Sequence, residues 1–508
     1  MIAERVRVVV LGSGFAGLAA AIKLREAGYD DLVILERADA IGGTWRDNHY
    51  PGCACDVPAH LYSYSFAPNP DWSQAFAPQP EIRAYIERCA RRYRLHGLVR
   101  FGAEVVSAEL DEASATWTVR AADGRTWIAD VVIAATGGLS RPAVPALPGL
   151  ERFTGRRWHS AAWDHDAPLD GKRVAVVGTG ASAIQFVPKL VPRVERLHLF
   201  QRTPPWVLPR PDHTFSAVEK ALFRVPAVRW LYRARLYWGH ELRAVPFTLE
   251  PRLLALAQRV ALGHLHRHVA DPALRRKLTP DYVMGCKRIL MSNDYYPALA
   301  RPNVEVVTGG IREVTAGGVI GADGVERRVD AIVFGTGFDV HDYLGPMKIV
   351  GRGGVELGAR WRASAEAYLG TTVPEFPNLF VIVGPNTGLG HNSIIFMIEC
   401  QVRYAVSALR AMDAGGYATV EPRADVTARY NARLQARLAR TVWSTGCKSW
   451  YQDARGRNTT LWPGATAEFM ARTWRFDPAD YVMRRREPVA PSRPVAPPRP
   501  VAIAGGRR

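Results

Sequence analysis

Two glycine-rich clusters, far apart in the chain, have the spacing of a loop that binds the pyrophosphate of a dinucleotide. The first is Gly12-Ser13-Gly14-Phe15-Ala16-Gly17, and the second is Gly178-Thr179-Gly180-Ala181-Ser182-Ala183. Glycine has no Cβ, so the backbone can turn tightly and approach a phosphate at the N-terminus of the next helix. Each cluster follows a strand-like apolar stretch and precedes a helix-like one, the context that this fingerprint needs. The chain therefore predicts two dinucleotide sites and electron transfer between them.

A charged residue distinguishes the two sites. Glu36 follows the first cluster, after the apolar run 32–35, and Arg202 follows the second at the same spacing, after the run 197–200. A carboxylate can accept hydrogen bonds from a ribose diol, whereas a cation suits a 2′-phosphate that a carboxylate would repel. These residues predict FAD at the first site and NADPH at the second. A solvated surface arginine is the alternative interpretation of Arg202.

The pattern along the chain predicts the elements that position these residues. A chain of 508 residues is too long for one core. We expect an α/β fold with two Rossmann-like dinucleotide-binding domains, for FAD and NADPH, and a helical insertion. The expected parts are residues 1–141 and 372–480 for the FAD-binding domain, 142–209 and 286–371 for the NADPH-binding domain, 210–285 for the insertion, and 481–508 for a disordered basic tail rich in proline and arginine. The active site is expected where the two domains meet.

The composition limits which partners and which cellular location we expect for the protein. The net charge is +18, and part of this excess lies in the arginine-rich tail. Weak contact of the tail with anionic lipid or nucleic acid is one interpretation, but no nucleic-acid motif accompanies it, so we expect a passive tail. No apolar run reaches the ~20 residues needed to cross a bilayer, so we expect no transmembrane segment. A strand, turn and helix explain the N-terminal apolar run better than a signal peptide, and we expect a cytoplasmic protein.

The cysteines predict neither a disulfide framework nor a metal site. Six cysteines lie at positions 53, 55, 89, 286, 400 and 447. Cys53-x-Cys55 lacks the two-residue spacer of a thioredoxin-type pair, and no second pair or histidine cluster completes a zinc site. We therefore expect reduced, buried thiols and no metal. The same spacing argues against a FAD- and NADPH-dependent disulfide reductase.

A third motif lies between the two fingerprints and resembles a known family. The order Phe153-x-Gly155-x-x-x-His159-x-x-x-Trp163-Asp164 is similar to the signature of type I Baeyer–Villiger monooxygenases, within the flavin-containing monooxygenase superfamily. The resemblance covers about residues 5–470. Supporting segments are Gly42-Gly43-Thr44-Trp45, Tyr50-Pro51-Gly52, Gln201-Arg202-Thr203-Pro204 and Ser449-Trp450-Tyr451. The stretch Gly390-His391-Asn392-Ser393 resembles the branch around hydroxyacetophenone-type monooxygenases.

The resemblance implies an activity and a set of site residues. An enzyme of this kind uses FAD, NADPH and O2 to insert one oxygen atom beside a ketone carbonyl through a C4a-peroxyflavin, giving an ester or lactone. Arg288 matches the family's catalytic arginine and Asp56 the carboxylate beside it. A fixed cation is needed there because negative charge develops on oxygen. The expected cofactor-binding residues are Gly12, Gly14, Phe15, Gly17, Glu36, Thr44, Trp45, Asp47, Asp56, Tyr62, Val105, Asn392, Thr179, Gly180, Ala181, Ser182, Gln185, Gln201, Arg202, Thr203, Lys287, Arg288 and Trp450.

Some roles and the substrate have more than one interpretation. His159 and Trp163 share one face if their segment is helical, and they form either a hinge between domains or part of the catalytic site. The segment 52–56 lacks the arginine that many members carry before Cys55-Asp56. The substrate is therefore a cyclic, aryl or linear ketone, or a sulfide or amine. An N- or S-oxygenase of the same superfamily is the alternative, although such enzymes usually have a smaller aromatic residue at the position of Trp163. A third class is a catalytically idle flavoprotein that binds partners through its tail.

Overall fold

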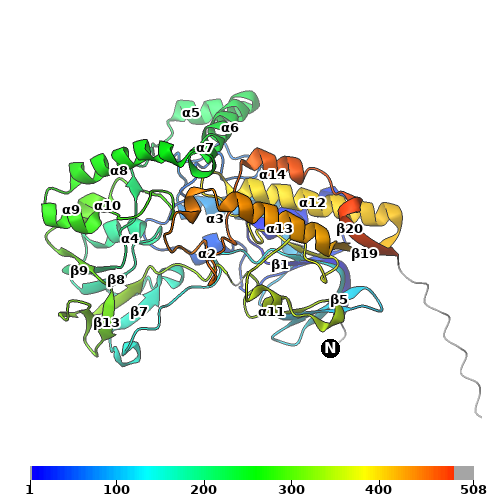
Figure 1. Ribbon diagram of the computed structural model, residues 1–508, viewed down its shortest axis with the longest axis horizontal. Helices are drawn as coiled ribbons and strands as arrows, with labels where there is room; N and C mark the ends of the chain where they lie inside the picture. The colour runs from blue at the N-terminus through cyan, green and yellow to red at the C-terminus, as the bar shows by residue number, and fades with distance from the viewer. Residues whose placement is uncertain (1–2, 342, 486–508) are drawn as a thin grey trace, which may run out of the picture.

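The computed structural model describes residues 3–341 and 343–485. Two sheet cores, each beginning with one glycine fingerprint, lie side by side (Figure 1). The helical insertion lies along the upper side of the view, over both cores, and the long helix α12 (Ile394–Gly415) lies over the N-terminal core. The expected α/β class with two Rossmann-like domains is therefore the observed architecture.

The first core is a mixed sheet in which β1 is the central strand. Residues Val6 to Leu11 of β1 are almost completely apolar and buried, as expected for a parallel strand covered on both faces. The strands of the sheet are β1 (Glu4–Leu11), β2 (Leu32–Leu35), β3 (Val99–Arg100), β4 (Val105–Asp111), β5 (Thr116–Ala121), β6 (Thr126–Ala134) and β18 (Leu379–Val381). β1 pairs in parallel with β2 and β6. The alanine-rich helix α1 (Phe15–Glu26) packs between this sheet and α12.

The return of the chain to the first core occurs earlier than the sequence predicts. β17 (Lys348–Val350) pairs in parallel with β4 at the edge of the first sheet. Tyr343, Ile349 and residues of α11 (Leu357–Trp361) belong to the same buried cluster as that sheet. The expected boundary at residue 372 is thus wrong, because residues 343–371 pack with the FAD-binding domain. A three-residue edge strand is too short to produce a periodic signal.

The second core is a parallel sheet in the order β12-β9-β8-β16-β7. Its strands are β7 (Arg156–His159), β8 (Arg173–Val177), β9 (Arg196–Gln201), β12 (Val304–Thr308) and β16 (Ala331–Phe334). The second fingerprint lies between β8 and α4 (Ala183–Leu190). A small antiparallel sheet precedes β16 and consists of β13 (Ile311–Val314), β14 (Gly318–Gly321) and β15 (Glu326–Arg328).

The region between the two parts of the second core is helical, as the sequence predicts for the insertion. Its helices are α5 (Ala217–Arg224), α6 (Pro226–Glu241), α7 (Ala244–Thr248), α8 (Leu254–His268) and α9 (Pro272–Leu278). The chain enters through β10 (Val207–Leu208) and leaves through β11 (Leu290–Met291), and these two short strands pair in parallel. The pairing holds the two ends of the insertion together, next to the second fingerprint.

Two chain segments cross side by side between the domains. Pro142 and Phe338 form an isolated antiparallel bridge, and the amide of Ala143 donates to the carbonyl of Gly337 at 2.9 Å. The hydroxyl of Thr136 donates to the carbonyl of Tyr343 at 2.9 Å. The connection between the domains is therefore a two-stranded linker rather than a single chain.

The C-terminal part differs from the expected boundary of the tail. β20 (Tyr481–Arg485) pairs antiparallel with β19 (Tyr417–Pro422), and Tyr481 is buried. Residues 481–485 thus belong to the folded domain, whereas residues 486–508 of the expected tail lie outside the described residues. α13 (Ala424–Leu438) and α14 (Thr466–Arg472) complete this region.

The cysteines differ in part from the expectation of reduced thiols. Cys286 and Cys447 form a disulfide, and Cys53, Cys55, Cys89 and Cys400 are free and buried. The bridge joins two segments 161 residues apart in sequence. The expectation failed here because the pairing depends on the approach of the insertion's end to the C-terminal region, which sequence spacing does not encode.

Candidate functional site

The first fingerprint forms a loop that excludes side chains. Gly12 has φ +98°, and a Cβ there would lie 2.8 Å from the carbonyl oxygen of Ala135. A Cβ on Gly17 would overlap the carbonyl oxygen of Gly12. Gly14 is the N-cap of α1 and faces the backbone of Gly43. Gly12 and Gly17 therefore admit no side chain, and the open N-terminus of α1 fits the pyrophosphate of FAD.

Glu36 follows β2 and reaches this loop. Its carboxylate accepts hydrogen bonds from the amide and hydroxyl of Ser13, at 2.9 and 2.7 Å, and from Arg46 at 3.0 Å. Burial alone would raise the pKa of the Glu36 carboxyl, but these hydrogen bonds and the charge of Arg46 hold it below its ordinary value. Glu36 is thus an ionised acceptor beside the dinucleotide loop, and its bond to a ribose diol stays a prediction. The sequence interpretation did not assign Arg46, which lies in α2 (Thr44–Asp47) and also binds Asp47.

The aromatic residues expected around the flavin lie together. The indole nitrogen of Trp45 donates to the hydroxyl of Tyr62 at 3.1 Å. Tyr62 also packs edge-on against Phe15, at the start of α1, with ring centroids 5.4 Å apart. Thr44 and Asp47 lie in the same short helix as Trp45. The predicted segments 15, 44–47 and 62 therefore meet beside the first fingerprint.

The second fingerprint repeats the geometry of the first. Gly178 has φ +104°, and a Cβ there would lie 2.5 Å from the carbonyl oxygen of Gly335. The hydroxyl of Thr179 donates to the carbonyl of Thr203 at 3.1 Å, which ties the loop to the segment after β9. Gly180, Ala181 and Ser182 lead into α4. The loop fits a second dinucleotide, with Arg202 and Thr203 at its edge.

Arg202 and Lys287 form a pair of adjacent cations. Partial burial and the positive charge of Arg202 lower the pKa of Lys287 below its ordinary value. Neither side chain forms an ion pair with the described residues, and the Lys287 ammonium lies 4.8 Å from the ring centre of Tyr282. Because β10 and β11 pair, the segments that carry the two residues are held together. The charge of Asp281 acts on Lys287 against that of Arg202. Two adjacent cations without an ion-pair partner fit the 2′-phosphate of NADPH.

Arg288 lies against Asp56, although 232 residues separate them in sequence. The Nε of Arg288 donates to Oδ2 of Asp56 at 3.0 Å, and Nη2 donates to the same oxygen. Burial alone would raise the pKa of the Asp56 carboxyl, but Arg288 holds it below its ordinary value, and the charge of Asp56 raises the pKa of Arg288. About a third of each side chain is accessible, 34% for Arg288 and 35% for Asp56. The pair is therefore charged, oriented and open to a ligand.

Four residues that the sequence predicts to bind a cofactor are instead in contact with other parts of the protein. Gln201 is fully buried and donates to the carbonyl of Lys277 at 2.7 Å. Gln185 bonds to the backbone of Ala54 at 3.0 Å, and Asn392 donates to Glu241 at 2.7 Å. Val105 begins β4, which lies between β5 and the edge strand β17. These side-chain groups hold the protein together, so a cofactor contact by them remains a prediction.

The third motif joins the two domains. Its segment is not an α-helix, because β7 ends at His159 and a single 3-10 turn precedes Trp163. Trp163 packs between Tyr50 and Phe186, with ring centroids 6.5 and 5.3 Å away. A Cβ on Gly155 would lie 2.5 Å from the carbonyl oxygen of Asp330 in the neighbouring segment. Trp163 therefore has packing contacts with both domains, and a hinge role for the motif stays a prediction.

Trp450 lies near the arginine that the sequence assigns to catalysis. Its ring is 42% exposed and lies 4.4 Å from that of the buried Tyr451. The phenol of Tyr451 is close enough to Arg288 to influence its pKa. The disulfide from Cys286 to Cys447 joins the two segments that carry Arg288 and Trp450. The predicted pieces of the site are thus held together covalently.

His391 is a residue to which sequence reasoning gave no role. It is buried beside Glu241, and neither ring nitrogen has a hydrogen-bond partner within the described ranges. Burial lowers its pKa to about 4, so the ring is neutral at physiological pH. A buried imidazole without partners is available to a ligand. The only sequence signal was its place in Gly390-His391-Asn392-Ser393.

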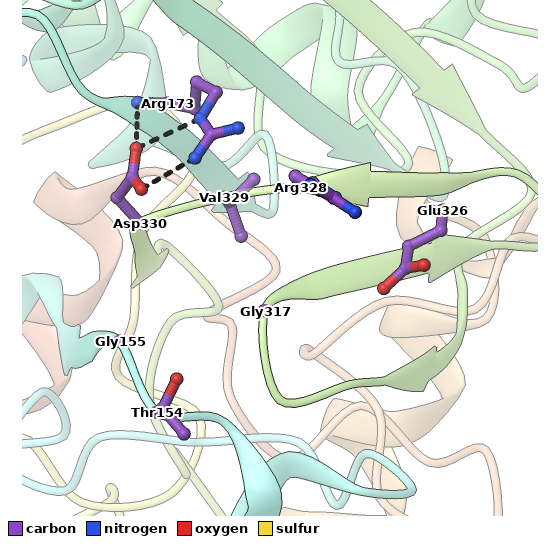
Figure 2. Close-up of a pocket in the computed structure, with 8 residues that line it drawn as sticks. All are labelled: Thr154, Gly155, Arg173, Gly317, Glu326, Arg328, Val329 and Asp330. Carbon is purple, nitrogen blue, oxygen red and sulfur yellow. Dashed lines mark hydrogen bonds and ion pairs between the residues drawn. The ribbon is translucent and has the colours of Figure 1, made fainter.

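A hollow of about 510 Å³ on the NADPH-binding domain lies away from the predicted site residues. Figure 2 shows that Arg173 and Asp330 face each other along its wall, and the residues around it come from the edge of the domain. Arg173 binds Asp330 through its amide, Nε and Nη2. None of the predicted site residues lines this hollow, and its charged pair is already satisfied, so we assign it no function.

The comparisons with known proteins agree with this geometry. Residues 5–220 match the family described as flavin-binding monooxygenase-like. The chain is 51% identical over 482 residues to a Baeyer-Villiger monooxygenase of Pseudomonas aeruginosa, covering 94% of this chain and 92% of that protein. The chain belongs to the Baeyer–Villiger monooxygenase family. It is therefore a monooxygenase, and the alternative of an N- or S-oxygenase is not favoured.

Solved structures of this family confirm the fold class. The closed crystal structure of cyclohexanone monooxygenase is similar with a TM-score of 0.86 and 30% identity, covering 95% of this chain and 100% of that one. The crystal structure of the OTEMO complex with FAD and NADP has a TM-score of 0.86 at 26% identity, with the same coverage of both chains. The prediction of FAD and NADPH as cofactors is confirmed. Over residues 3–341 and 343–485, no helix is long and apolar enough to cross a membrane.

Proposed function

We propose that this Baeyer–Villiger monooxygenase converts a small-molecule ketone and O2 into an ester or lactone, with Arg288 as its catalytic cation and Asp56 as the residue that positions it. The observation that carries the proposal is the contact of Arg288 with Asp56, in which both side chains are partly accessible. The relative at 51% identity and the cyclohexanone monooxygenase structure support a ketone as substrate.

The chemistry of the pair explains why an arginine is needed. Bound FAD, reduced by NADPH, supplies the activated oxygen. Arg288 keeps its positive charge at any pH at which the enzyme works, and Asp56 holds Nε and Nη2 in one orientation. Nη1 donates to no acceptor within the part of the chain that the structure describes. This free edge stabilises negative charge on the reacting oxygen and on the developing alkoxide.

The two loops and their charged residues bind the cofactors. Glu36 accepts the ribose hydroxyls of FAD, and the glycine loop before α1 takes its pyrophosphate. Arg202 and Lys287 bind the 2′-phosphate of NADPH, with the segment of Thr203 bonded to the second loop. Trp450 closes this side of the site over the nicotinamide cofactor.

The test separates loss of oxygen insertion from loss of cofactor binding. In Arg288→Ala we expect ester formation to fall by about 100-fold or more, because a fixed charge at the reacting oxygen is lost. NADPH oxidation and flavin content should persist, with hydrogen peroxide as the product. Esters are measured by gas chromatography with a cyclic, an aryl and a linear ketone, and sulfoxide with a thioether.

A surface arginine provides the matched control. Arg193 is half-exposed and paired with Asp170 on the NADPH-binding domain, so Arg193→Ala should retain normal activity. Ester formation at the normal rate by Arg288→Ala would show that Arg288 is not the catalytic cation. Sulfoxide without any ester from the unaltered enzyme would contradict the ketone substrate.

A further inference from the structure

The helical insertion carries most of the exposed large apolar side chains of the protein. Among the described residues, eleven such side chains lie between Val218 and Val260, and only eight lie in the rest of the chain. Contiguous exposed apolar surface of this kind marks an interaction site in soluble folds. Figure 1 shows α5, α6, α7 and α8 next to one another along one side of the molecule.

The outward face of α6 is the clearest part of this surface. Leu231, Trp238 and Leu242, directly after the helix, share one face and are 60%, 58% and 69% exposed. Trp230, at the edge of that face, is 67% exposed. The opposite face holds Arg233, which donates to the backbone carbonyls of His60 and Ser63, and the buried His240. Tyr237 and Glu241, on the flank of the helix, accept hydrogen bonds from Thr466 of the FAD-binding domain. α6 is therefore firmly attached on one side and apolar on the side that faces solvent.

The neighbouring helices extend the apolar face. On α5, Val218, Leu222 and Val225 are exposed at helical spacing. On the turn before α8 and on α8 itself, Leu253 and Val260 are exposed, whereas Leu254 and Leu265 of the same region are buried. Each helix thus has one face in the protein and one apolar face outside. We call the exposed apolar side chains of residues 218–260 the apolar face of the insertion.

Positive charge surrounds this apolar face. Residues 216–268 contain nine lysines and arginines and three glutamates, and one of these, Glu241, is buried and hydrogen-bonded. Arg235 and Arg259 are exposed and form no ion pair with any described residue. The Arg252 side chain is 95% exposed and lies 4.0 Å from the carboxylate of Glu250. Apolar and cationic side chains are therefore interleaved on one surface.

We propose that the apolar face of the insertion docks onto the surface of a lipid membrane that contains anionic lipids. Helices with tryptophan and leucine on one face and arginine beside them lie in the plane of the headgroups, with the apolar side chains below. Trp230 and Trp238 have the amphipathic ring that prefers this interface. Arginine pairs with lipid phosphates. Since no described helix can cross a membrane, the protein lies on the surface rather than spanning it.

Charge favours a membrane over a second copy of the chain. A two-fold dimer through this face would bring two surfaces of net positive charge together, at the cost of electrostatic repulsion. An anionic membrane is complementary to them. Dimerisation through this face is therefore an outcome that the test must distinguish.

The experiment measures sedimentation of the full-length holoenzyme with vesicles. We expect binding to vesicles of phosphatidylcholine with about one-third phosphatidylglycerol, weaker binding to pure phosphatidylcholine, and a decrease with added salt. The double variant Trp230→Ser/Trp238→Ser should bind the anionic vesicles at least about tenfold more weakly, because its apolar contact with lipid is reduced. Its melting temperature and its turnover of a water-soluble ketone should stay unchanged, since both rings face solvent.

Two controls make the outcome specific. Trp474→Ser removes a tryptophan that is 53% exposed outside the insertion and should bind vesicles normally. A chain that ends at Arg485 tests the basic tail and should also bind. Absence of binding by the unaltered enzyme, normal binding by the double variant, or loss of binding on removal of the tail would each overturn the proposal. A dimer in analytical ultracentrifugation that the double variant abolishes, without any vesicle binding, would assign the face to self-association.

Discussion

Four charged residues at the junction of the domains differ in what surrounds them, and this decides what each can bind. Arg288 has a carboxylate partner in Asp56, so the pair adds no net charge but presents an oriented guanidinium. Arg202 and Lys287 form no ion pair with a carboxylate within the described residues, and the charge of Asp281 offsets that of Lys287 only in part. A polyanionic group suits the second pair, and a small reacting oxygen suits the first.

We expect the preference for NADPH over NADH to depend on Arg202 and Lys287. Removing one hydrogen-bonded charge costs about 1.5–3 kcal/mol, which is about 10- to 100-fold in affinity. We expect Arg202→Ala and Lys287→Ala each to lower kcat/KM for NADPH by this factor and to leave kcat/KM for NADH nearly unchanged, since NADH has no 2′-phosphate. Steady-state kinetics with both cofactors measure the ratio. The Arg193→Ala variant is the control, and an unchanged ratio in both variants would remove the 2′-phosphate role.

At the scale of single elements, the glycine loops are set by contacts between backbones. Gly12 and Gly178 occupy equivalent positions after β1 and β8. Each faces a backbone carbonyl oxygen of the segment after a neighbouring strand, that of Ala135 after β6 and that of Gly335 after β16. Gly17 lies against Gly12 inside the first turn of α1, whereas a Cβ on Gly14 would only touch the Cα of Gly43, at 3.6 Å. The same residue type thus serves two purposes, close packing at Gly17 and access for a ligand at Gly14.

This difference predicts opposite results for two similar substitutions. Gly17→Ala would force a methyl group into the carbonyl of Gly12, so we expect a loss of ~3 kcal/mol or more and little folded protein. Gly14→Ala meets its nearest neighbour at 3.6 Å and should keep the melting temperature of the apoprotein, but bind FAD weakly because the methyl group occupies phosphate space. Flavin absorbance per protein and thermal unfolding of the apoprotein measure both. Equal flavin content in Gly14→Ala and the unaltered protein would contradict this use of the loop.

The strand β20 makes the end of the folded chain measurable. Tyr481 is buried, and its hydroxyl lies 2.9 Å from that of Thr372 and 2.8 Å from that of Tyr404. Truncation after Asp480 removes this aromatic contact, and we expect a loss of about 3–5 kcal/mol and a clearly lower melting temperature. Truncation after Arg485 keeps β20 and should leave the melting temperature unchanged. Equal melting temperatures of the two truncated chains would mean that β20 contributes nothing.

At the scale of the whole molecule, contacts between the domains determine how the site is assembled. The two-stranded linker, the Gln185 bond to Ala54 and the packing of Trp163 join the domains. His49 of the first domain and His165 of the second also meet, with their ring nitrogens 2.8 Å apart and the rings stacked. One hydrogen bond between two imidazoles requires that at least one of them is neutral.

This histidine pair predicts a pH dependence of stability. Partial burial and the charge of His165 lower the pKa of His49 below 6.5, with Arg83 adding to this effect and Asp47 opposing it. Because the folded-state pKa is depressed, the stabilisation is present above the ordinary pKa and is lost as pH falls through the lowered value. We expect the melting temperature to fall more steeply between about pH 7 and 5 in the unaltered protein than in His165→Gln. If the melting temperature falls equally with pH in the two proteins, the histidine pair does not bind additional protons on unfolding.

The local features of the chain could be predicted because they depend on neighbours in sequence. The glycine loops, Glu36, Arg202 and the helical insertion follow from patterns within a few tens of residues. Steric limits on the backbone and the alternation of apolar stretches act over that range. The resemblance of the motifs to a known family extended the predictions to Arg288 and Asp56, whose contact the structure shows.

Other features required the tertiary structure. The return of the chain at β17, the strand β20 and the disulfide of Cys286 with Cys447 each join segments distant in sequence. The hydrogen bond of Arg46 to Glu36 and the unpartnered ring of His391 follow only from what packs around these residues. The apolar residues of the insertion show helical periodicity in the sequence, but only packing shows which of their faces is left uncovered. The sequence by itself determined the dinucleotide loops and the family, because both depend on local residue order, whereas pairing and burial depend on distances in space and were decided by the fold.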